Sequence, residues 1–174
     1  MSADYAERTV VGLVEAWNTL AMASYERQEA IAIHASPEAV YDLISDVTRT
    51  GEWSPICKSC WWHDGDSAQV GAHFTGRNER DGHTWETVSE VVVAERGREF
   101  AWVVGEGYVR WSYTMAPLDE GTELTEFWEF LPAGIEMFHE KYGDKAPGLI
   151  EARIEDAHQG IPATLAAIKR IAEK

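Results

Sequence analysis

The sequence predicts an α+β protein in which an antiparallel sheet of about seven strands faces one long C-terminal helix. Two observations carry this prediction. Between about residues 59 and 130, apolar and polar residues alternate, and glycine-containing turns separate the alternating segments, as in successive antiparallel strands. From about residue 147 the apolar spacing lengthens to three and four residues, which indicates an amphipathic helix. A chain of 174 residues has the length of a single domain.

The charge balance excludes several classes of partner. Fifteen basic residues stand against thirty acidic ones, for a formal net charge of −15. Such a surface repels phosphate backbones and anionic lipid headgroups, so we expect neither nucleic acid nor membrane surfaces as partners. No run approaches the roughly 20 apolar residues that span a bilayer, and Asp4 and Glu7 stand where a signal peptide would be basic. We therefore expect no membrane insertion and a cytoplasmic location.

The first expected element is an amphipathic helix over residues 3–23. We assign residues 1–24 to this N-terminal helix and residues 25–174 to the main domain. The apolar stripe must be buried against that domain or against a second copy of the chain, so a homodimer is one expected assembly. The stripe consists of Val10, Leu13, Val14, Trp17, Leu20 and Ala21.

A short strand and a helix are expected next. Ile31 and Ile33 alternate in the segment 27–34, as on one face of a strand. Ser36 is a good N-cap and Pro37 suits the first helical position, so a helix is predicted to begin at Pro37 and to end before residue 50. The segment 51–55 then forms a turn.

The alternation is clearest in the strand over residues 83–94. We expect the side chains that recur at every second position to share one face, which the rest of the protein covers. That face comprises Trp85, Thr87, Ser89, Val91 and Val93, and the following strands add Phe100, Trp102, Val104, Val109, Trp111, Tyr113, Met115, Leu124, Glu126, Trp128 and Phe130.

The last two expected elements follow residue 132. The segment 132–147 is too long and too apolar for a simple connector, so a short helix or lid is expected there. In the C-terminal helix, Gly160 and Pro162 interrupt the apolar stripe. Because proline removes a backbone hydrogen bond, we expect either a bend near residues 158–162 or two abutting helices.

This order of elements resembles the START-like, or SRPBCC, superfamily, which includes the polyketide cyclase and lipid-transfer family. The resemblance lies in the stretch IAIHASPEAVYDLISDVTRTGEWSP from Ile31 to Pro55, in Gly121–Thr125, and in Pro162–Lys169, and it covers about residues 27–174. It implies the helix-grip fold, a strongly curved antiparallel sheet wrapped around the C-terminal helix with an elongated apolar cavity between them.

The aromatic residues are the candidate lining of that cavity. The chain holds eight Trp, six Tyr and five Phe, and flat rings with a few polar atoms suit a hydrophobic or aromatic small molecule. We expect such a ligand to enter past the segments 51–55 and 132–147; alternatively, the rings simply fill the core. The expected ligand-binding residues are Trp53, Trp62, Phe74, Asn78, Trp85, Thr87, Trp102, Trp111, Tyr113, Trp128 and Phe138.

Glu126 is the first candidate for acid–base chemistry, because its alternation with Leu124 and Trp128 places it on the apolar face. Burial of a carboxyl group raises its pKa unless a partner compensates, and a carboxylic acid of this kind in a cavity is a candidate general acid or base. The alternatives are a register error that exposes Glu126 or a structural pairing with Arg77 or Arg110.

Ser89 is the second catalytic candidate, and it rests on the resemblance. In aromatase and cyclase members of the family, a serine after a Trp-Glu pair acts with an arginine two positions on, and Trp85, Glu86 and Ser89 match that stretch. Val91, however, stands at the arginine position, and Cys60 replaces a pocket tyrosine. The resemblance therefore leaves two functions open: hydrophobic ligand binding, or a polyketide cyclase, aromatase or dehydratase type of enzyme.

Cys57 and Cys60 have the spacing of a redox motif, yet they stand at the start of a predicted strand. Three residues of a regular strand span about 10 Å, beyond the roughly 7 Å between Cα atoms that a disulfide tolerates. We therefore expect both to be small buried hydrophobic residues. The six dispersed histidines lack the spacing of a zinc site, and no phosphate-binding loop or nucleophile elbow is present, so we expect no metal and no cofactor.

Overall fold

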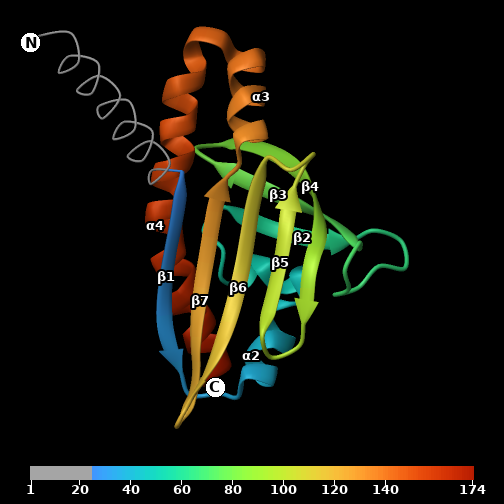
Figure 1. Ribbon diagram of the computed structural model, residues 1–174, viewed down its shortest axis with the longest axis vertical. Helices are drawn as coiled ribbons and strands as arrows, with labels where there is room; N and C mark the ends of the chain where they lie inside the picture. The colour runs from blue at the N-terminus through green and yellow to red at the C-terminus, as the bar shows by residue number, and fades with distance from the viewer. Residues whose placement is uncertain (1–24) are drawn as a thin grey trace, which may run out of the picture.

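The computed structural model describes residues 25–174, in which a seven-stranded antiparallel sheet with the order β1-β7-β6-β5-β4-β3-β2 curves around the helix α4 (Figure 1). This arrangement confirms the α+β class and the helix-grip fold. The helix expected over residues 3–23, and with it the division at residue 24, lies outside the described residues. The elements are β1 (Glu26–Ile33), α2 (Pro37–Ile44), η1 (Val47–Glu52), β2 (Cys57–Trp62), β3 (His73–Arg80), β4 (His83–Glu95), β5 (Glu99–Val104), β6 (Val109–Leu118), β7 (Gly121–Phe130), α3 (Pro132–Tyr142), η2 (Gly143–Lys145) and α4 (Ala146–Ala172).

Helix α2 begins as its sequence predicts. Ser36 is the N-cap, with its Oγ accepting a hydrogen bond of 3.2 Å from the backbone N–H of Ala39, and Pro37 occupies the first helical position. This cap satisfies one of the N–H groups that have no partner within the helix. Val40 and Ile44 are on its buried face, with which the helix packs against β5, β6, β7 and α4.

The strand register places one face of every strand toward α4, and we call this the inner face. Trp102, Trp111 and Trp128 are Cα partners across β5, β6 and β7, so the three indoles form one row of it. The alternation fails at one point in β4. The register shifts between Val91, opposite Trp102, and Val93, opposite Ala101. This bulge turns Val93 away from the inner face, so the prediction that Val93 shares the face of Trp85 was wrong.

The connection after β7 is the expected short helix, α3. Helix α4 then runs without interruption for 27 residues, although Pro162 stands inside it. The expectation of two abutting helices was therefore wrong. Pro162 has no N–H to give to the carbonyl of His158, and the packing of Ile161 and Leu165 against the sheet holds the helix together across this missing bond. None of the helices in residues 25–174 is both long and apolar enough to cross a membrane.

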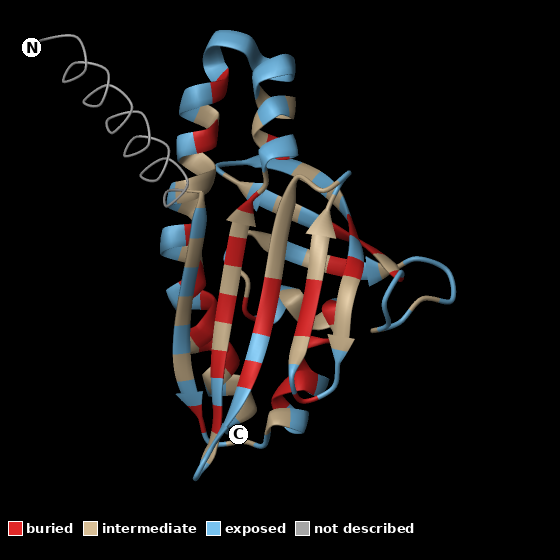
Figure 2. Ribbon diagram, in the orientation of Figure 1, coloured by how far each residue is buried: buried red, intermediate tan, exposed pale blue. Residues whose placement is uncertain are grey.

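The layer between the sheet and α4 has two ends that differ in burial (Figure 2). We call the end beside α2 the closed end; its side chains belong to one hydrophobic cluster and are at most 6% exposed. It comprises Ile33, Val40, Phe100, Met115, Leu124, Ile161, Leu165 and Ile168. At the end beside α3, which we call the open end, buried rings stand next to apolar side chains that stay partly exposed. The partly exposed side chains are Trp62, Trp102, Trp111, Ile135, Phe138 and Ile154.

Candidate functional site

A continuous series of ring contacts crosses the inner face at the open end. Ring centroids 5.2 to 6.4 Å apart connect it from β2 to α3, and neighbouring rings are stacked, tilted or edge-to-face. Such contacts are favourable for aromatic pairs. The series runs through Trp62, Phe74, Trp102, Trp111, Trp128, Phe130 and Phe138. The structure therefore brings most of the expected ligand-binding rings together on one wall.

The other expected binding residues lie around this wall. Asn78 faces inward from β3, and its amide donates to the carbonyl of Gly76 and to the Thr87 hydroxyl, each over 3.3 Å. Trp85 lies at the rim, stacked on His83 and covered by the guanidinium of Arg153 from α4. Trp53 is 5% exposed, so this part of the segment 51–55 packs inward.

Glu126 and Tyr113 form a buried polar pair between the closed end and the ring wall. They are Cα partners on β7 and β6, and the Tyr113 hydroxyl donates a hydrogen bond of 3.1 Å to Glu126 Oε1. Glu126 is only 4% exposed, and no described residue is a partner for its Oε2. The two arginines considered as partners are engaged elsewhere, Arg77 with Glu86 and Arg110 with Glu99.

Burial controls the ionisation of this pair. Desolvation raises the pKa of Glu126 from 4.5 to about 8, and the hydrogen bond from Tyr113 opposes only part of that rise. Desolvation and the adjacent carboxyl group likewise raise the pKa of Tyr113 well above its usual value, while a side-chain interaction with Trp53 acts in the opposite direction. At neutral pH the Glu126 carboxyl is therefore mostly protonated, and it carries an O–H donor as well as an acceptor.

The edge strand β1 adds a second carboxyl group beside this pair. Glu29 is the Cα partner of Glu126, and it forms an ion pair with Arg27 on the same strand. The Arg27 Nε is buried and, like Glu126 Oε2, has no partner among residues 25–174. The inner face thus carries two unsatisfied polar atoms on neighbouring strands.

Ser89 is 3% exposed on the inner face, but the register separates it from Glu126. Ser89 aligns through Val104 and Val109 with Phe130, whereas Glu126 aligns with Tyr113 and Phe100. Three strand spacings and four residues along β7 lie between them, which amounts to about 19 Å measured along the sheet. The two catalytic candidates therefore share the inner face without forming a pair.

The two cysteines of β2 correct the geometry expected from a regular strand. The register shifts between Cys57 and Ser59, and this bulge places both thiols on the inner face with their Sγ atoms 3.2 Å apart. Gly76 lies opposite them, where a Cβ would lie 3.4 Å from each sulfur. Cys57 also lies close enough to Tyr113 to contribute to the rise of its pKa. The expectation that the cysteines are held apart was wrong.

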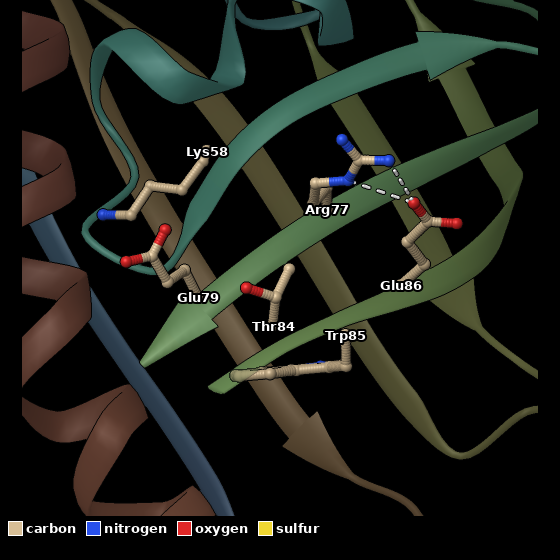
Figure 3. A pocket seen from close by; sticks show the side chains of 6 residues that line it. All are labelled: Lys58, Arg77, Glu79, Thr84, Trp85 and Glu86. Carbon is tan, nitrogen blue, oxygen red and sulfur yellow. Dashed lines mark hydrogen bonds and ion pairs between the residues drawn. The ribbon is translucent and has the colours of Figure 1, made fainter. Parts of the chain in front are cut away.

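A surface hollow lies outside the ring wall, around the ends of β3 and β4 (Figure 3). It has a volume of about 590 Å³, and its lining is largely charged: Lys58, Arg77, Glu79, Thr84, Trp85 and Glu86. Arg77 and Glu86 form an ion pair across it, 2.7 Å apart. Of the expected binding residues only Trp85 lines this hollow, so its chemistry does not suit an apolar ligand.

With this geometry in view, the comparisons with known proteins identify the family. The family model described as polyketide cyclase / dehydrase and lipid transport matches residues 22–164. The chain belongs to this family. The START-like resemblance seen in the sequence is thereby confirmed. A search of curated proteins found no match.

Several solved structures share this fold. The solution NMR structure of a Polyketide_cyc-like protein from Corynebacterium glutamicum is 54% identical over 86% of this chain and 91% of its own, with a TM-score of 0.65. The Zhui aromatase/cyclase from Streptomyces sp. R1128 is 18% identical over 85% of this chain and 93% of its own, with a TM-score of 0.66. A protein from Chromobacterium violaceum is 19% identical over 86% of this chain and 98% of its own, with a TM-score of 0.63. The last two likenesses show the fold alone.

The sequence predicts which residues belong to this site better than it predicts which of them contact one another. Glu126 and Tyr113 were both singled out, but their hydrogen bond depends on the β6–β7 register, which the alternation of each strand does not contain. The turn at Gly121 was the available signal, because counting back from it in both strands pairs the two residues. No comparable signal in the sequence predicts the bulge between Cys57 and Ser59.

Proposed function

We propose that this protein binds a hydrophobic or aromatic small molecule between the open end of the inner face and α4, with Glu126 as its polar anchor. The observation that carries the proposal is the buried Oε2 of Glu126, which has no partner among the described residues. Buried polar atoms are nearly always hydrogen-bonded, so this oxygen calls for a polar group from outside the described chain. A hydroxyl or carbonyl on an otherwise apolar ligand would supply one.

The ring wall supports the same proposal. Trp62, Trp102 and Trp111 face inward and yet remain partly exposed, whereas rings in a filled core are as buried as Phe100, at 0%. A flat apolar ligand placed against these indoles would remove their remaining exposed surface from water. The family description, which combines cyclases, dehydrases and lipid transport, fits an apolar cargo or substrate.

The proposal is tested by comparing two probes that differ in one hydroxyl group. We expect naphthol to quench the tryptophan fluorescence of the protein on binding, and to bind more tightly than naphthalene because its hydroxyl group reaches Glu126. In Glu126→Leu the preference for naphthol should fall by up to about tenfold, the value of one buried hydrogen bond. Glu123→Gln, on the exposed side of the same strand, is the matched control and should bind as the original protein does.

Two results would overturn this proposal. One is an equal preference for naphthol in the original protein and in Glu126→Leu, which would remove Glu126 as the anchor. The other is the absence of quenching by both probes, which would remove the site itself.

A second candidate function is acid–base catalysis of the cyclase, aromatase or dehydratase type. The observation that favours it is the pKa of Glu126, about 8, which allows a buried carboxylic acid to give up and take back a proton near neutral pH. Two observations oppose it. Val91 and Cys60 stand where the aromatase and cyclase members have an arginine and a pocket tyrosine, and Ser89 is separated from Glu126. Binding therefore remains the first proposal.

Three further expectations also remain proposals. We propose that residues 1–24 form a helix separate from the domain of residues 25–174, that this helix can pair two copies of the chain, and that the protein works in the cytoplasm. The acidic net charge of −15 supports the expectation that it avoids polyanions.

A further inference from the structure

The dithiol on the inner face of β2 has a geometry that a regular strand would not give. Cys57 is the Cα partner of Asn78, and Cys60 is the Cα partner of Gly76. Asn78 and Gly76 are two residues apart on a regular strand, which corresponds to about 6.6 Å. The bulge therefore shortens the Cys57–Cys60 separation from the three-residue span of a regular strand to that of two residues. The result falls within the Cα range of natural disulfides, which extends to about 6.8 Å.

The sulfur atoms are already close and face each other. Cys57 Sγ and Cys60 Sγ are 3.2 Å apart, so small rotations of the two side chains suffice to reach the bond length of about 2.05 Å. Gly76 leaves room for both sulfurs, since a Cβ at this position would lie 3.4 Å from each of them. Cys57 is partly exposed and Cys60 is 8% exposed, so a small oxidant has access while a bulky one has little.

The surroundings distinguish the two thiols. The Cys57 thiol and the Thr50 hydroxyl both favour the Cys60 thiolate, which lowers the pKa of Cys60 despite its burial. The pKa of Cys57 is raised, because the neighbouring Cys60 thiolate and burial both disfavour its ionisation. Cys60 is thus the better nucleophile and Cys57 the better source of the second sulfur.

We propose that Cys57 and Cys60 are a reversible redox site, which hydrogen peroxide or a similarly small peroxide converts to an intramolecular disulfide. The Cys60 thiolate attacks one peroxide oxygen, the O–O bond breaks, and a sulfenic acid and one water form once a proton is taken up. The Cys57 sulfur then attacks the Cys60 sulfur, its S–H proton leaves with the hydroxyl group as a second water, and the S–S bond forms. Each sulfur loses one electron and the peroxide gains two.

Oxidation would alter the wall of the inner face beside Tyr113. Cys57 lies close to the Tyr113 hydroxyl, which in turn hydrogen-bonds Glu126. A disulfide removes both S–H donors from this region and fixes β2 in its bulged form. The structure thus places an oxidisable pair on the same inner face as the Tyr113–Glu126 pair, near enough for Cys57 to influence the pKa of Tyr113.

The test uses the full chain and needs no ligand. Reduced protein is treated with hydrogen peroxide, unfolded in the presence of a maleimide, and weighed by mass spectrometry. Since the chain has only 2 cysteines, an intramolecular disulfide means that treated, unfolded protein takes up no maleimide and has the mass of a single chain. Dithiothreitol should restore both additions. In Cys57→Ser we expect dimedone to trap a sulfenic acid on Cys60. In Cys60→Ser trapping on Cys57 should be slower, because burial still raises the pKa of the Cys57 thiol.

Three outcomes would overturn the proposal: cysteines that both remain reactive after peroxide, sulfinic acid without a disulfide, and disulfides only between chains. Equal trapping rates in Cys57→Ser and Cys60→Ser would overturn the assignment of Cys60 as the first sulfur to react. The mass measurement on the original protein does not depend on the folding of either variant. Because it involves no probe molecule, its failure is also distinct from a failure of the proposed ligand-binding function.

Discussion

The closed end and the open end of the inner face are built from the same sheet and the same helix, yet they differ in what they enclose. At the closed end, aliphatic side chains such as Leu124, Ile161 and Ile168 interdigitate with α2 and are at most 2% exposed. At the open end, Trp102 and Trp111 face α4 but keep part of their surface accessible. Close-packed interiors leave almost no side-chain surface accessible, so the remaining exposure of the two indoles means that α4 covers them incompletely.

One alternating pattern can therefore produce either a filled core or a partly exposed wall, depending on what covers it. Tyr113 and Glu126 mark the boundary, because on β6 and β7 they lie between Met115 and Leu124 of the closed end and Trp111 and Trp128 of the ring wall. A polar pair in this place would weaken a continuous core. It is tolerable where the apolar packing ends.

The largest expected effect is the pH dependence that Glu126, at the boundary, gives to the free energy of unfolding. The pKa of Glu126 is about 8 in the folded protein and near its ordinary value of 4.5 in the unfolded chain. The folded state therefore holds a proton that the unfolded state releases. The contribution of Glu126 to the free energy of unfolding is therefore greatest below about pH 4.5 and falls as pH rises toward 8, by at most about 4 to 5 kcal/mol.

Glu126→Gln removes this titration, so the variant should lose much less stability than the original protein between about pH 5 and pH 9. Urea unfolding at both pH values measures the difference, and Glu123→Gln, with its exposed side chain, should behave as the original protein does. A loss in Glu126→Gln equal to that in the original protein would place the boundary carboxyl in water.

The next effect compares two isoleucines of α4. Ile168 is 0% exposed at the closed end, so Ile168→Ala should lower the free energy of unfolding by about 3 kcal/mol through lost contacts and a cavity. Ile154 faces the open end and is partly exposed, so Ile154→Ala should cost about 1 kcal/mol. Denaturant unfolding of both variants provides the measurement. Equal losses would mean that the two ends are packed alike.

The smallest expected effect concerns the N-cap of α2, the helix that covers the closed end. Ser36 caps α2, so Ser36→Ala should lower the free energy of unfolding by about 1 kcal/mol, while Ser36→Asp should retain the cap and most of the stability. Thermal unfolding of the pair separates loss of the cap from loss of the serine itself. If both variants unfold like the original protein, α2 is held at the closed end by the packing of Val40 and Ile44 and not by its N-cap.

Much of this architecture could be predicted from local pattern. The start of α2 followed from Ser36 and Pro37, and the inner face from the alternation of apolar residues. The two β-bulges could not be predicted, because each inserts one residue into a pattern that has a period of two without changing composition. Val93 and Cys57 were misplaced for that reason. The continuity of α4 across Pro162 likewise depends on tertiary packing, which local propensity does not report.

The bulge in β2 also constrains how the chain can vary in length. Lys58 is the extra residue, and its carbonyl oxygen would lie 2.2 Å from a Cβ at position 51, so Gly51 must stay without a side chain as long as the bulge exists. A deletion of Lys58 would leave Cys57, Cys60 and Trp62 on their present faces, because the strand would become regular. Evolution or an engineer can therefore shorten this strand at position 58 without moving its flanking side chains to the other face of the sheet.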